Sequence, residues 1–361
     1  MRVVLTGAAG FLGWHTGLRL ASRTAHDIVP VDEAEWSRLD ELVRDADAVI
    51  HLAGVNRAAD DEVVSGNIRL AEDLAAAVRS SGRAPALVYA NSIQSGNGTP
   101  YGIGKERAGE VLRAVAQEVG GPFVDVVLPN LFGEHGRPDY NSFVATFTHR
   151  VVEGRAPEVQ DRPVELLHVG GAADAIVGSL DGVSATIRPR GRDTTVASVL
   201  ETLTRQFGAY RSGELPVLSS GLDVELFNTL RAAMFPKYCP IPLEWRTDAR
   251  GGLLEVVRAQ GSEGQTFVST TRPGVTRGQH LHLRKVERFV VVDGTARIAL
   301  RRALTDQVVT FDVTGEQAVA IDMPTGWYHN ITNTGAGTLT TVFWANELFD
   351  PDDADTYPGA V

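Results

Sequence analysis

Residues 2–13 read RVVLTGAAGFLG, a short apolar run followed by a glycine-rich turn. The run is too short for a helix and predicts a strand, and the residues after the turn have a helical pattern. Gly7 would permit the tight turn, Gly10 would let the backbone approach a pyrophosphate, and Gly13 would let helix and strand pack closely. Glycine-rich turns also serve as plain connectors, but a position between strand and helix favours a dinucleotide-binding loop. Its expected cofactor contacts are Gly7, Gly10, Phe11, Leu12 and Gly13.

A second apolar run, residues 28–31, ends at Asp32, nineteen residues after Gly13. A carboxylate at this point would accept hydrogen bonds from the adenosine ribose of the cofactor. An acid there favours NAD over NADP, because a 2′-phosphate would meet a like charge. The alternative is that Asp32 and Glu33 cap the helix that follows.

The composition sets the outer limits. A chain of 361 residues is too long for one ordinary core, so two domains are expected, and 43% hydrophobic and 22% charged residues are typical of a soluble globular protein. The net charge of −11, without a Lys/Arg cluster, argues against a nucleic acid or an anionic membrane as partner. We expect neither a membrane span nor a signal peptide. The single cysteine, Cys239, excludes an internal disulfide, which favours a reducing cytoplasm and a packing role.

Strand-like and helix-like segments alternate through the first half of the chain. We expect helices near 35–44, 67–80 and 101–119, and strands at 48–50, 86–90 and 123–128. This alternation predicts an α/β fold in which parallel strands are joined by right-handed crossovers, a Rossmann-like doubly wound sheet. Its ligands should lie at the carboxyl ends of the strands.

Polar residues follow two of these strands. Residues 51–56 read HLAGVN, Asn91 and Ser92 follow the next strand, and Tyr101 and Lys105 stand four residues apart, on one face of a helix. A cation beside the phenol would lower a pKa that is normally about 10, so that the tyrosine could exchange protons near neutrality. A Tyr-x-x-x-Lys pair also occurs by chance on many helices. Together with the glycine loop and Ser92, it favours carbonyl reduction.

These motifs, with PNLFG at residues 129–133, resemble the extended short-chain dehydrogenases that act on nucleotide sugars. The resemblance covers about 240 residues. It implies that Tyr101 is the acid or base at the sugar carbonyl, that Lys105 positions the nicotinamide ribose, and that Ser92 hydrogen-bonds the substrate oxygen. Further cofactor contacts are expected at Leu52, Ala53, Gly54, Asn56, Tyr101, Lys105 and Asn130.

Two features depart from this family. The loop between Ser92 and Tyr101 is shorter than in most members, which puts substrate contacts from that loop in doubt. Residues 168–171 read HVGG, where the family usually carries acidic residues after the valine.

The segment from Phe132 to about Pro240 should supply a sugar-nucleotide lid, with helices at 141–150 and 199–207. By resemblance, its Asn141 and Arg162 contact the nucleotide or its diphosphate, since a guanidinium grips phosphate through paired bonds. The alternative is a helix cap and a solvated surface charge.

A proline-rich stretch, residues 235–242, is expected to be a linker. Beyond it, helical patterns are absent and short β-rich runs recur at 253–258, 265–271, 288–292, 295–301, 308–313, 318–322 and 338–344. This spacing predicts an all-β sandwich or barrel. We expect domains at 1–243 and 244–361.

The β-rich half contains four candidate metal ligands: His280, His282, Glu287 and His329. Two histidines at i and i+2 on a strand project from the same face, and a carboxylate and a third imidazole from neighbouring strands would complete a mixed nitrogen and oxygen site. Lone histidines are usually structural. These four positions match both motifs of the cupins, which are jelly-roll barrels.

The pairing of the two halves resembles bifunctional capsular-polysaccharide enzymes, in which a dehydrogenase domain precedes a zinc cupin. The resemblance is nearly end to end and includes residues 51–57, 138–142, 248–251 and 346–351. It implies that the cupin epimerises C3 of a UDP-2-acetamido-2,6-dideoxy-4-hexulose. The dehydrogenase domain would then reduce C4 to a 6-deoxy-L-talose derivative. The implied cofactors are NADP(H) or NAD(H) and Zn²⁺.

The chemistry makes this order sensible, because a 4-keto group acidifies the C3 proton and must survive until epimerisation is complete. Zn²⁺ could stabilise the enolate as a Lewis acid, or it could only hold the fold. The nucleotide and the C2 substituent also stay open.

Two other classes of function compete with this interpretation. One is a single-activity 4-ketoreductase, or a 4-epimerase that retains NAD, with the cupin used for substrate binding and dimerisation. The other is a non-enzymatic sensor of NAD(H), which would leave Ser92, Tyr101 and Lys105 unexplained. By analogy with cupins that pair through their strands, we expect a homodimer.

Overall fold

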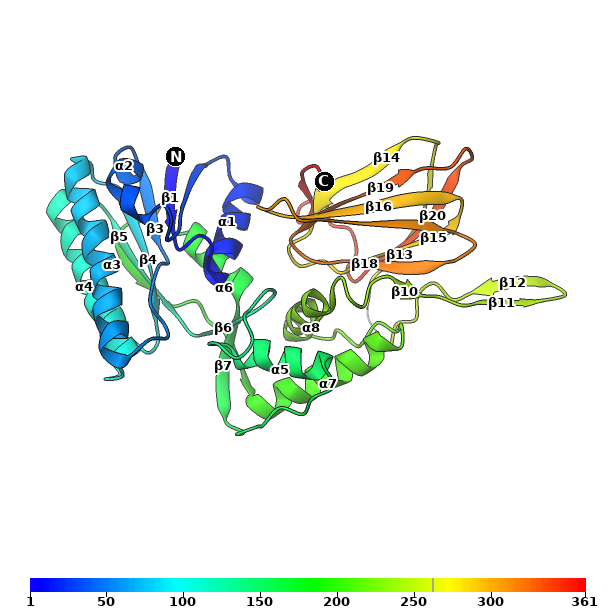
Figure 1. Ribbon diagram of the computed structural model, residues 1–361, viewed down its shortest axis with the longest axis horizontal. Helices are drawn as coiled ribbons and strands as arrows, with labels where there is room; N and C mark the ends of the chain where they lie inside the picture. The colour runs from blue at the N-terminus through cyan, green and yellow to red at the C-terminus, as the bar shows by residue number, and fades with distance from the viewer. Residues whose placement is uncertain (262) are drawn as a thin grey trace. The chain divides into compact units, whose positions relative to one another are not determined.

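The computed structural model describes residues 1–261 and 263–361 (Figure 1). The chain divides into two compact units, Met1–Phe132 with Pro163–Thr194, and Gly133–Arg162 with Thr195–Val361. The second unit therefore contains only part of the expected lid, residues 133–162 and 195–240, together with the β-rich half, whereas residues 163–194 belong to the first unit. The predicted boundary between a domain at 1–243 and a domain at 244–361 is a different division of the chain, and it stays a prediction.

The first unit is built on a six-stranded parallel sheet with the order β2-β1-β3-β4-β5-β8. The strands are β1 (Arg2–Thr6), β2 (Asp27–Val31), β3 (Ala48–His51), β4 (Ala86–Ser92), β5 (Phe123–Leu128) and β8 (Ala185–Ile187). This confirms the predicted Rossmann-like sheet. Its topology brings the carboxyl ends of β1, β3 and β4, which carry the predicted site residues, to one edge.

Helices cover both faces of this sheet (Figure 1). The helices are α1 (Phe11–Arg23), η1 (Trp36–Arg38), α2 (Leu39–Val43), α3 (Asp60–Ser81), α4 (Pro100–Val119) and α6 (Val169–Val177). Residues of α2, α3 and α4 pack on one face, and residues of α1 and α6 pack on the other. The predicted start of α3 at residue 67 is wrong, because the helix begins at Asp60, where three acidic residues complement the helix dipole.

A smaller sheet follows the strand order β6-β7-β9, with β6 (Asn130–Phe132), β7 (Pro163–His168) and β9 (Arg192–Thr195). The second unit contributes α5 (Phe143–Val152), α7 (Val196–Arg211) and α8 (Gly221–Met234). Helix α7 is longer than predicted, and α8 was not predicted. The sequence signal for α8 is the capping box that Ser220 and Asp223 form at its start.

The β-rich half consists of two five-stranded sheets, ordered β10-β18-β15-β20-β13 and β17-β16-β19-β14-β21. The first comprises β10 (Ile241–Pro242), β13 (Gln265–Thr271), β15 (Glu287–Asp293), β18 (Val319–Met323) and β20 (Leu339–Ala345). The second comprises β14 (Thr276–Leu281), β16 (Thr295–Arg302), β17 (Val308–Thr314), β19 (Trp327–Asn333) and β21 (Tyr357–Pro358). Apolar side chains of both sheets, such as Phe289 and Ile298, form one core, so the predicted antiparallel cupin-type architecture is confirmed.

Two details of this half differ from expectation. The run 253–258 is strand only as far as Leu254, at the end of β12 (Gly251–Leu254), which pairs with β11 (Trp245–Asp248) in a hairpin. The proline-rich stretch is more than a linker, because Ile241 pairs with Ala320 of β18. Cys239 packs against the core, as predicted, and burial raises the pKa of its thiol to about 12.

Among the described residues, no helix combines the length and the apolar character that crossing a membrane requires.

Candidate functional site

The glycine loop between β1 and α1 adopts the conformation that its sequence predicts. Gly7 has a φ of +69°, in the region that favours glycine, and its N–H donates to the carbonyl of Val31 over 2.8 Å. The N–H of Gly10 donates to the carbonyl of Gly7 over 3.0 Å. A Cβ on Gly13 would collide with that same carbonyl oxygen, so α1 can approach β1 only without a side chain there.

The start of α1 fits a pyrophosphate. In the described part of the chain, no side chain caps the helix at Gly10, and its first turn holds no acidic residue. The first N–H groups of a helix have no partner within the helix, and together with the helix dipole they attract an anion. Phe11, Leu12 and Gly13, which were predicted to contact the cofactor, occupy this first turn.

Asp32 follows β2, directly after the residue that binds Gly7. Its Oδ1 accepts a hydrogen bond from the N–H of Ala34 over 2.9 Å, which holds the turn after β2. The alternative, that Asp32 and Glu33 cap the following helix, is wrong, because the N-cap residues of η1 and α2 are Glu35 and Arg38. Contacts with the Glu35 side chain and with the Ala34 backbone lower the pKa of Asp32. Asp32 is therefore a carboxylate at neutral pH, and its contact with a ribose stays a prediction.

The loop after β3 lies against the glycine loop, since a Cβ on Gly7 would come within 2.8 Å of the nitrogen of Ala53. This loop carries the predicted cofactor contacts Leu52, Ala53, Gly54 and Asn56. Asn67, buried on α3, holds the loop through its Oδ1, 3.2 Å from the N–H of Val55, and its Nδ2, 2.7 Å from the carbonyl of Val55. Sequence reasoning missed Asn67, although an amide on the apolar face of α3 was a usable signal.

The predicted catalytic residues come from β4 and α4. Ser92 ends β4, Tyr101 lies in the first turn of α4, and Lys105 follows one turn later. The hydroxyl of Thr99 accepts from the N–H of Gly102 over 3.1 Å and so fixes the helix start. Nζ of Lys105 donates to the carbonyl of Ala90 in β4 over 2.6 Å, which ties this turn of α4 to the strand that ends at Ser92.

The pKa values of Tyr101 and Lys105 differ from expectation. Burial raises the pKa of Tyr101 and lowers the pKa of Lys105 to about 7. The prediction that Lys105 lowers the pKa of Tyr101 is wrong for this arrangement, because its Nζ bonds to Ala90 and lies 4.3 Å from the ring centre of Tyr89. A phenol of raised pKa stays protonated at neutral pH, which suits a proton donor.

The departure at residues 168–171 has a steric explanation. A Cβ on Gly170 would collide with the guanidinium of Arg19, which is buried and pairs with Asp174 over 2.9 Å. His168 instead caps α6 by accepting from the N–H of Gly170 over 3.2 Å. The carboxylate that pairs with Arg19 is therefore that of Asp174, four residues after Gly170, and not one directly after the valine.

The other predicted ligand-binding residues are exposed. Asn130 lies in β6, where its Nδ2 donates to the carbonyl of Glu165 over 3.3 Å. Asn141 and Arg162 belong to the second unit. Asn141 directly precedes Ser142, the N-cap of α5. Arg162 lies beside the start of α7, because its carbonyl accepts from the N–H of Val196 over 3.1 Å. Their contacts with a substrate stay predictions.

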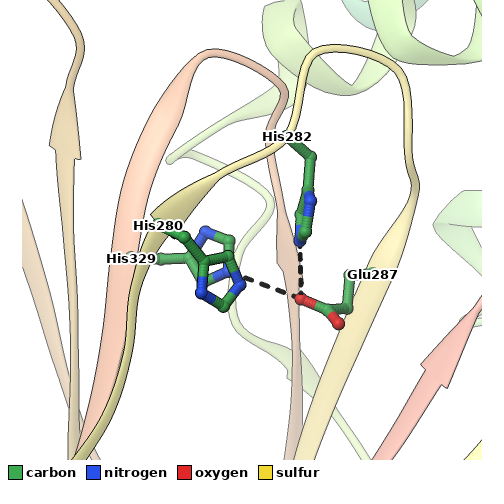
Figure 2. Close-up of side chains that lie close together, drawn as sticks. All are labelled: His280, His282, Glu287 and His329. Carbon is green, nitrogen blue, oxygen red and sulfur yellow. Dashed lines mark hydrogen bonds and ion pairs between the residues drawn. The ribbon is translucent and has the colours of Figure 1, made fainter. Parts of the chain in front are cut away.

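The four predicted metal ligands come together in the second unit. Figure 2 shows the imidazoles of His280, His282 and His329 and the carboxylate of Glu287 pointing toward one another. One ligand atom from each lies within 4.8 Å of all the others. His280 lies in β14, His282 directly follows that strand, Glu287 begins β15, and His329 lies in β19. His280 faces His329 in the β14–β19 register.

The distances and charges in this cluster fit a metal ion. Oε2 of Glu287 lies 3.1 Å from Nε2 of His282 and 3.4 Å from Nε2 of His329. Two ligands of a tetrahedral ion with bonds of about 2.0 to 2.1 Å are roughly 3.4 Å apart. Nε2 of His329 is buried and, within the described residues, makes no hydrogen bond. Apart from its contact with Glu287, which is attractive only when the imidazole is protonated, this nitrogen has no polar partner among the described residues, and a bound cation would supply one.

The protonation states agree with this interpretation. Burial, and then the neighbouring imidazoles, lower the pKa of His280 to about 4, and burial also lowers the pKa of His329. Burial alone would raise the pKa of Glu287, but the imidazoles of His282 and His329 outweigh it and keep the pKa low. Neutral imidazoles and an ionised carboxylate are the forms that bind metal.

Backbone carbonyls orient two of the imidazoles from behind. Nδ1 of His282 lies 2.6 Å from the carbonyl oxygen of Asp355, and Nδ1 of His329 lies 3.2 Å from that of Trp327. Each bond makes Nδ1 the protonated nitrogen and leaves Nε2 free to bind a cation. Asp355 is a second residue that sequence reasoning missed.

The Rossmann-like sheet and its glycine loop define a dinucleotide-binding class of protein, and comparison with known families agrees. The chain belongs to the NAD dependent epimerase/dehydratase family, which matches residues 3–189, and residues 246–357 match the polysaccharide biosynthesis C-terminal domain. The chain is similar to the UDP-2-acetamido-2,6-beta-L-arabino-hexul-4-ose reductase of Pseudomonas aeruginosa. The two are 35% identical over 370 residues, which cover 100% of this chain and 99% of the relative.

Solved structures show the same relationship. The capsular polysaccharide assembling protein CapF from Staphylococcus aureus is 31% identical, with a TM-score of 0.61 and full coverage of both chains. The UDP-glucose 4-epimerase of Thermotoga maritima is 18% identical, with a TM-score of 0.52, and covers 58% of this chain and 83% of its own. The latter likeness supports the fold of the dehydrogenase part alone.

Proposed function

We propose that the chain is a bifunctional nucleotide-sugar enzyme. Its β-rich half epimerises C3 of a UDP-linked 4-keto-6-deoxy-N-acetylhexosamine, and its Rossmann-like half then reduces C4, giving a 6-deoxy-L-talose-type product. The observation that carries the proposal is the presence, in one chain, of a nucleotide loop with Ser92, Tyr101 and Lys105 and of a separate His₃Glu cluster. The relative that matches end to end is named as the reductase of a hexul-4-ose.

In the reduction, a nicotinamide held by the glycine loop and Lys105 would supply the hydride for C4. Tyr101 donates its proton to the carbonyl oxygen, so the C=O double bond becomes an alcohol. Burial supports this role, since it keeps the phenol protonated at neutral pH. Ser92 hydrogen-bonds the same oxygen, and Lys105 holds the nicotinamide ribose, as the family resemblance implies.

In the epimerisation, the three histidines and Glu287 would hold Zn²⁺. A base would take the C3 proton to give an enolate, and an acid would return a proton to C3 on the opposite face. The metal would supply a Lewis acid for the charge on the enolate oxygen. The protein's part is to bind the ion through four groups and to shield the site from water. Three of the four side chains are buried, and His280 is half-buried.

For the cofactor we propose NADH. Asp32 is ionised and follows β2 beside the glycine loop, where a 2′-phosphate would be repelled. NADPH is the alternative, and the family does not decide between them.

We also propose a homodimer, formed through the β-rich half. Strand β13 is a sheet edge that exposes Phe267 and Val268, and the β11–β12 hairpin exposes Trp245 and Leu253. Exposed apolar residues on an unpaired edge favour pairing with another chain. Light scattering after gel filtration should give a dimer for the wild type and a monomer for Val268→Lys, and a monomeric wild type would contradict the proposal.

A single-activity reductase is the second candidate, because the Pseudomonas aeruginosa relative is named as a reductase alone. The β-rich half would then bind substrate or join two chains. The single activity could instead be that of a 4-epimerase, which would be purified with tightly bound NAD.

The test is incubation with UDP-linked and dTDP-linked 4-keto-6-deoxy sugars in D₂O, with and without NADH or NADPH, followed by NMR of the sugar. We expect deuterium at C3 without reductant, and a reduced, epimerised product with it. Tyr101→Phe should lose most reduction and keep C3 exchange. Tyr238→Phe is the matched control. It also removes a tyrosine hydroxyl, but one that bonds to the carbonyl of Val152 and has no part in the proposed reduction. Reduction without C3 exchange would favour the single-activity enzyme.

A further inference from the structure

The last eight residues, 354–361, form a segment that we call the C-terminal strap, and it lies along the strand that carries the first metal-ligand candidate. Strand β21 of the strap pairs with β14, with Pro358 opposite His280. The N–H of Gly359 donates to the carbonyl of Gln279 over 2.9 Å and extends this pairing. The strap is therefore an edge strand that fixes the backbone on both sides of His280.

Asp355, at the start of the strap, contacts the next ligand candidate directly. Its carbonyl oxygen lies 2.6 Å from Nδ1 of His282. This bond fixes the tautomer and the ring orientation of His282, so that Nε2 faces Glu287.

The carboxylate of Asp355 binds the turn that follows His282. Its Oδ1 accepts from the N–H of Leu283 over 3.1 Å, and its Oδ2 accepts from the N–H groups of Arg284 over 2.9 Å and Lys285 over 2.8 Å. These three N–H groups belong to the connection between His282 and Glu287. Bonds from backbone N–H groups to a buried carboxylate are charge-assisted and strong, so they hold the connection in one conformation.

Asp355 is 3% exposed and has a φ of +44°, a conformation that costs energy for a residue other than glycine. Such backbone strain persists only where surrounding contacts over-determine it. Here the contacts that impose it are the four bonds to His282 and to the turn after it. The backbone strain and the hydrogen bonds both indicate that Asp355 holds His282 and the turn after it in place.

A third contact joins the strap to β19. A Cβ on Gly359 would collide with the ring of Tyr328, the neighbour of His329, so the strap lies flat against that ring. The strap therefore touches the elements that carry His280, His282 and His329, although it contributes no ligand atom to the cluster.

We propose that Asp355 is a positioning residue for the metal cluster and that the strap pre-organises the cluster before a cation arrives. The inference rests on the proposed metal site. It predicts that the affinity for metal depends on Asp355, whose backbone carbonyl orients His282, 73 residues away, and whose carboxylate holds the turn after that histidine.

The test compares Asp355→Asn with Asp352→Asn, which removes an exposed charge from the chain just before the strap. Asparagine tolerates positive φ and keeps the shape of the side chain, but its amide nitrogen would face backbone N–H groups that need an acceptor. Zn²⁺ affinity is measured by competition with a chromophoric chelator, and the ligand geometry is followed by the visible spectrum of the Co²⁺-loaded chain. We expect the Zn²⁺ affinity of Asp355→Asn to fall at least ~10-fold, with an altered Co²⁺ spectrum, and that of Asp352→Asn to match the wild type.

Dinucleotide binding and circular dichroism of the metal-free chain show whether each variant is folded. Should Asp355→Asn fail to fold, Asp355→Gly relieves the strain at positive φ and still removes the carboxylate. A folded variant of Asp355 with wild-type affinity and spectrum would overturn the inference. Failure of the wild type to bind Zn²⁺ would instead count against the proposed metal site.

Discussion

Oε2 of Glu287 lies 3.1 Å from Nε2 of His282, and both side chains are buried. Removing the charge from Glu287 would leave three imidazoles without a negative charge among them, which attract a divalent cation less strongly. We expect Glu287→Gln to lower the Zn²⁺ affinity by a factor on the order of 10 to 100, by comparison with changes in the groups around metal sites. The metal content after dialysis and the rate of C3 exchange measure the effect. Glu316→Gln, on an exposed turn, is the control, and equal metal content in both variants would show that Glu287 is no ligand.

Gly13 tests the nucleotide loop. Alanine at this position would push against the carbonyl oxygen of Gly7, so the backbone of the loop must shift. Because the first N–H groups of α1 are proposed to bind the pyrophosphate, we expect Gly13→Ala to weaken dinucleotide binding at least tenfold, which corresponds to about 1.4 kcal/mol. Calorimetric titration measures it. Gly208→Ala places the same methyl group on α7, where no atom lies within 4 Å, and should bind as the wild type does.

The buried ion pair between Arg288 and Asp322 tests the packing of the second unit. Nε and Nη2 of Arg288 lie 2.7 and 2.9 Å from the two carboxylate oxygens of Asp322, and both side chains are 1% exposed. Breaking such a pair leaves a buried charge without its partner, which typically costs about 3–5 kcal/mol. We expect Asp322→Asn to lower the urea midpoint of the second unit accordingly. Asp312→Asn breaks an exposed pair with Arg297 and should change that midpoint little; equal effects would mean that the buried pair is not special.

The parts of the fold that sequence predicted are those that local pattern determines. The glycine loop, the strand at 123–128 and the helix at 101–119 each depend on the order of residues within about twenty positions. His280 and His282 were found in the same way, because strand alternation places them on one face. Glu287 and His329 were assigned through the resemblance to the cupin motifs.

The parts that sequence missed depend on contacts between distant segments. Asp355 is 73 residues from His282, and Arg288 is 34 residues from Asp322, so no local pattern connects either pair. The pKa of Tyr101 was predicted in the wrong direction for a related reason. The spacing of Tyr101 and Lys105 is visible in the sequence, but the carbonyl of Ala90 that takes up the ammonium group, and the burial of the phenol, are not.

His51 should make the first unit sensitive to acid. Burial first, and then the charge of Lys105, lower the pKa of His51 to about 3, whereas an unfolded histidine titrates near ~6.5. Between these values the unfolded chain binds a proton that the folded chain does not, so stability falls as the pH drops, by up to about 1.4 kcal/mol per pH unit. We expect His51→Asn to have a shallower slope of unfolding free energy between pH 6 and 4, measured by urea titration at several pH values. Exposed His149→Gln should keep the wild-type slope, and an unchanged slope in His51→Asn would show that another group is responsible.

Asp32 should decide which nicotinamide cofactor the chain prefers. Its carboxylate both accepts from the N–H of Ala34 and would repel a 2′-phosphate, and two substitutions separate these effects. Asp32→Asn keeps an oxygen that can accept from Ala34 and removes the charge, whereas Asp32→Ala removes both. If repulsion sets the preference, both variants should shift the ratio of kcat/KM for NADPH over NADH upward, by roughly tenfold. Asp45→Asn, an exposed acid further along the chain, should leave the ratio unchanged. If Asp32→Asn keeps the wild-type ratio and only Asp32→Ala changes the rates, Asp32 acts as a cap for the turn that follows it and leaves the choice of cofactor to other residues.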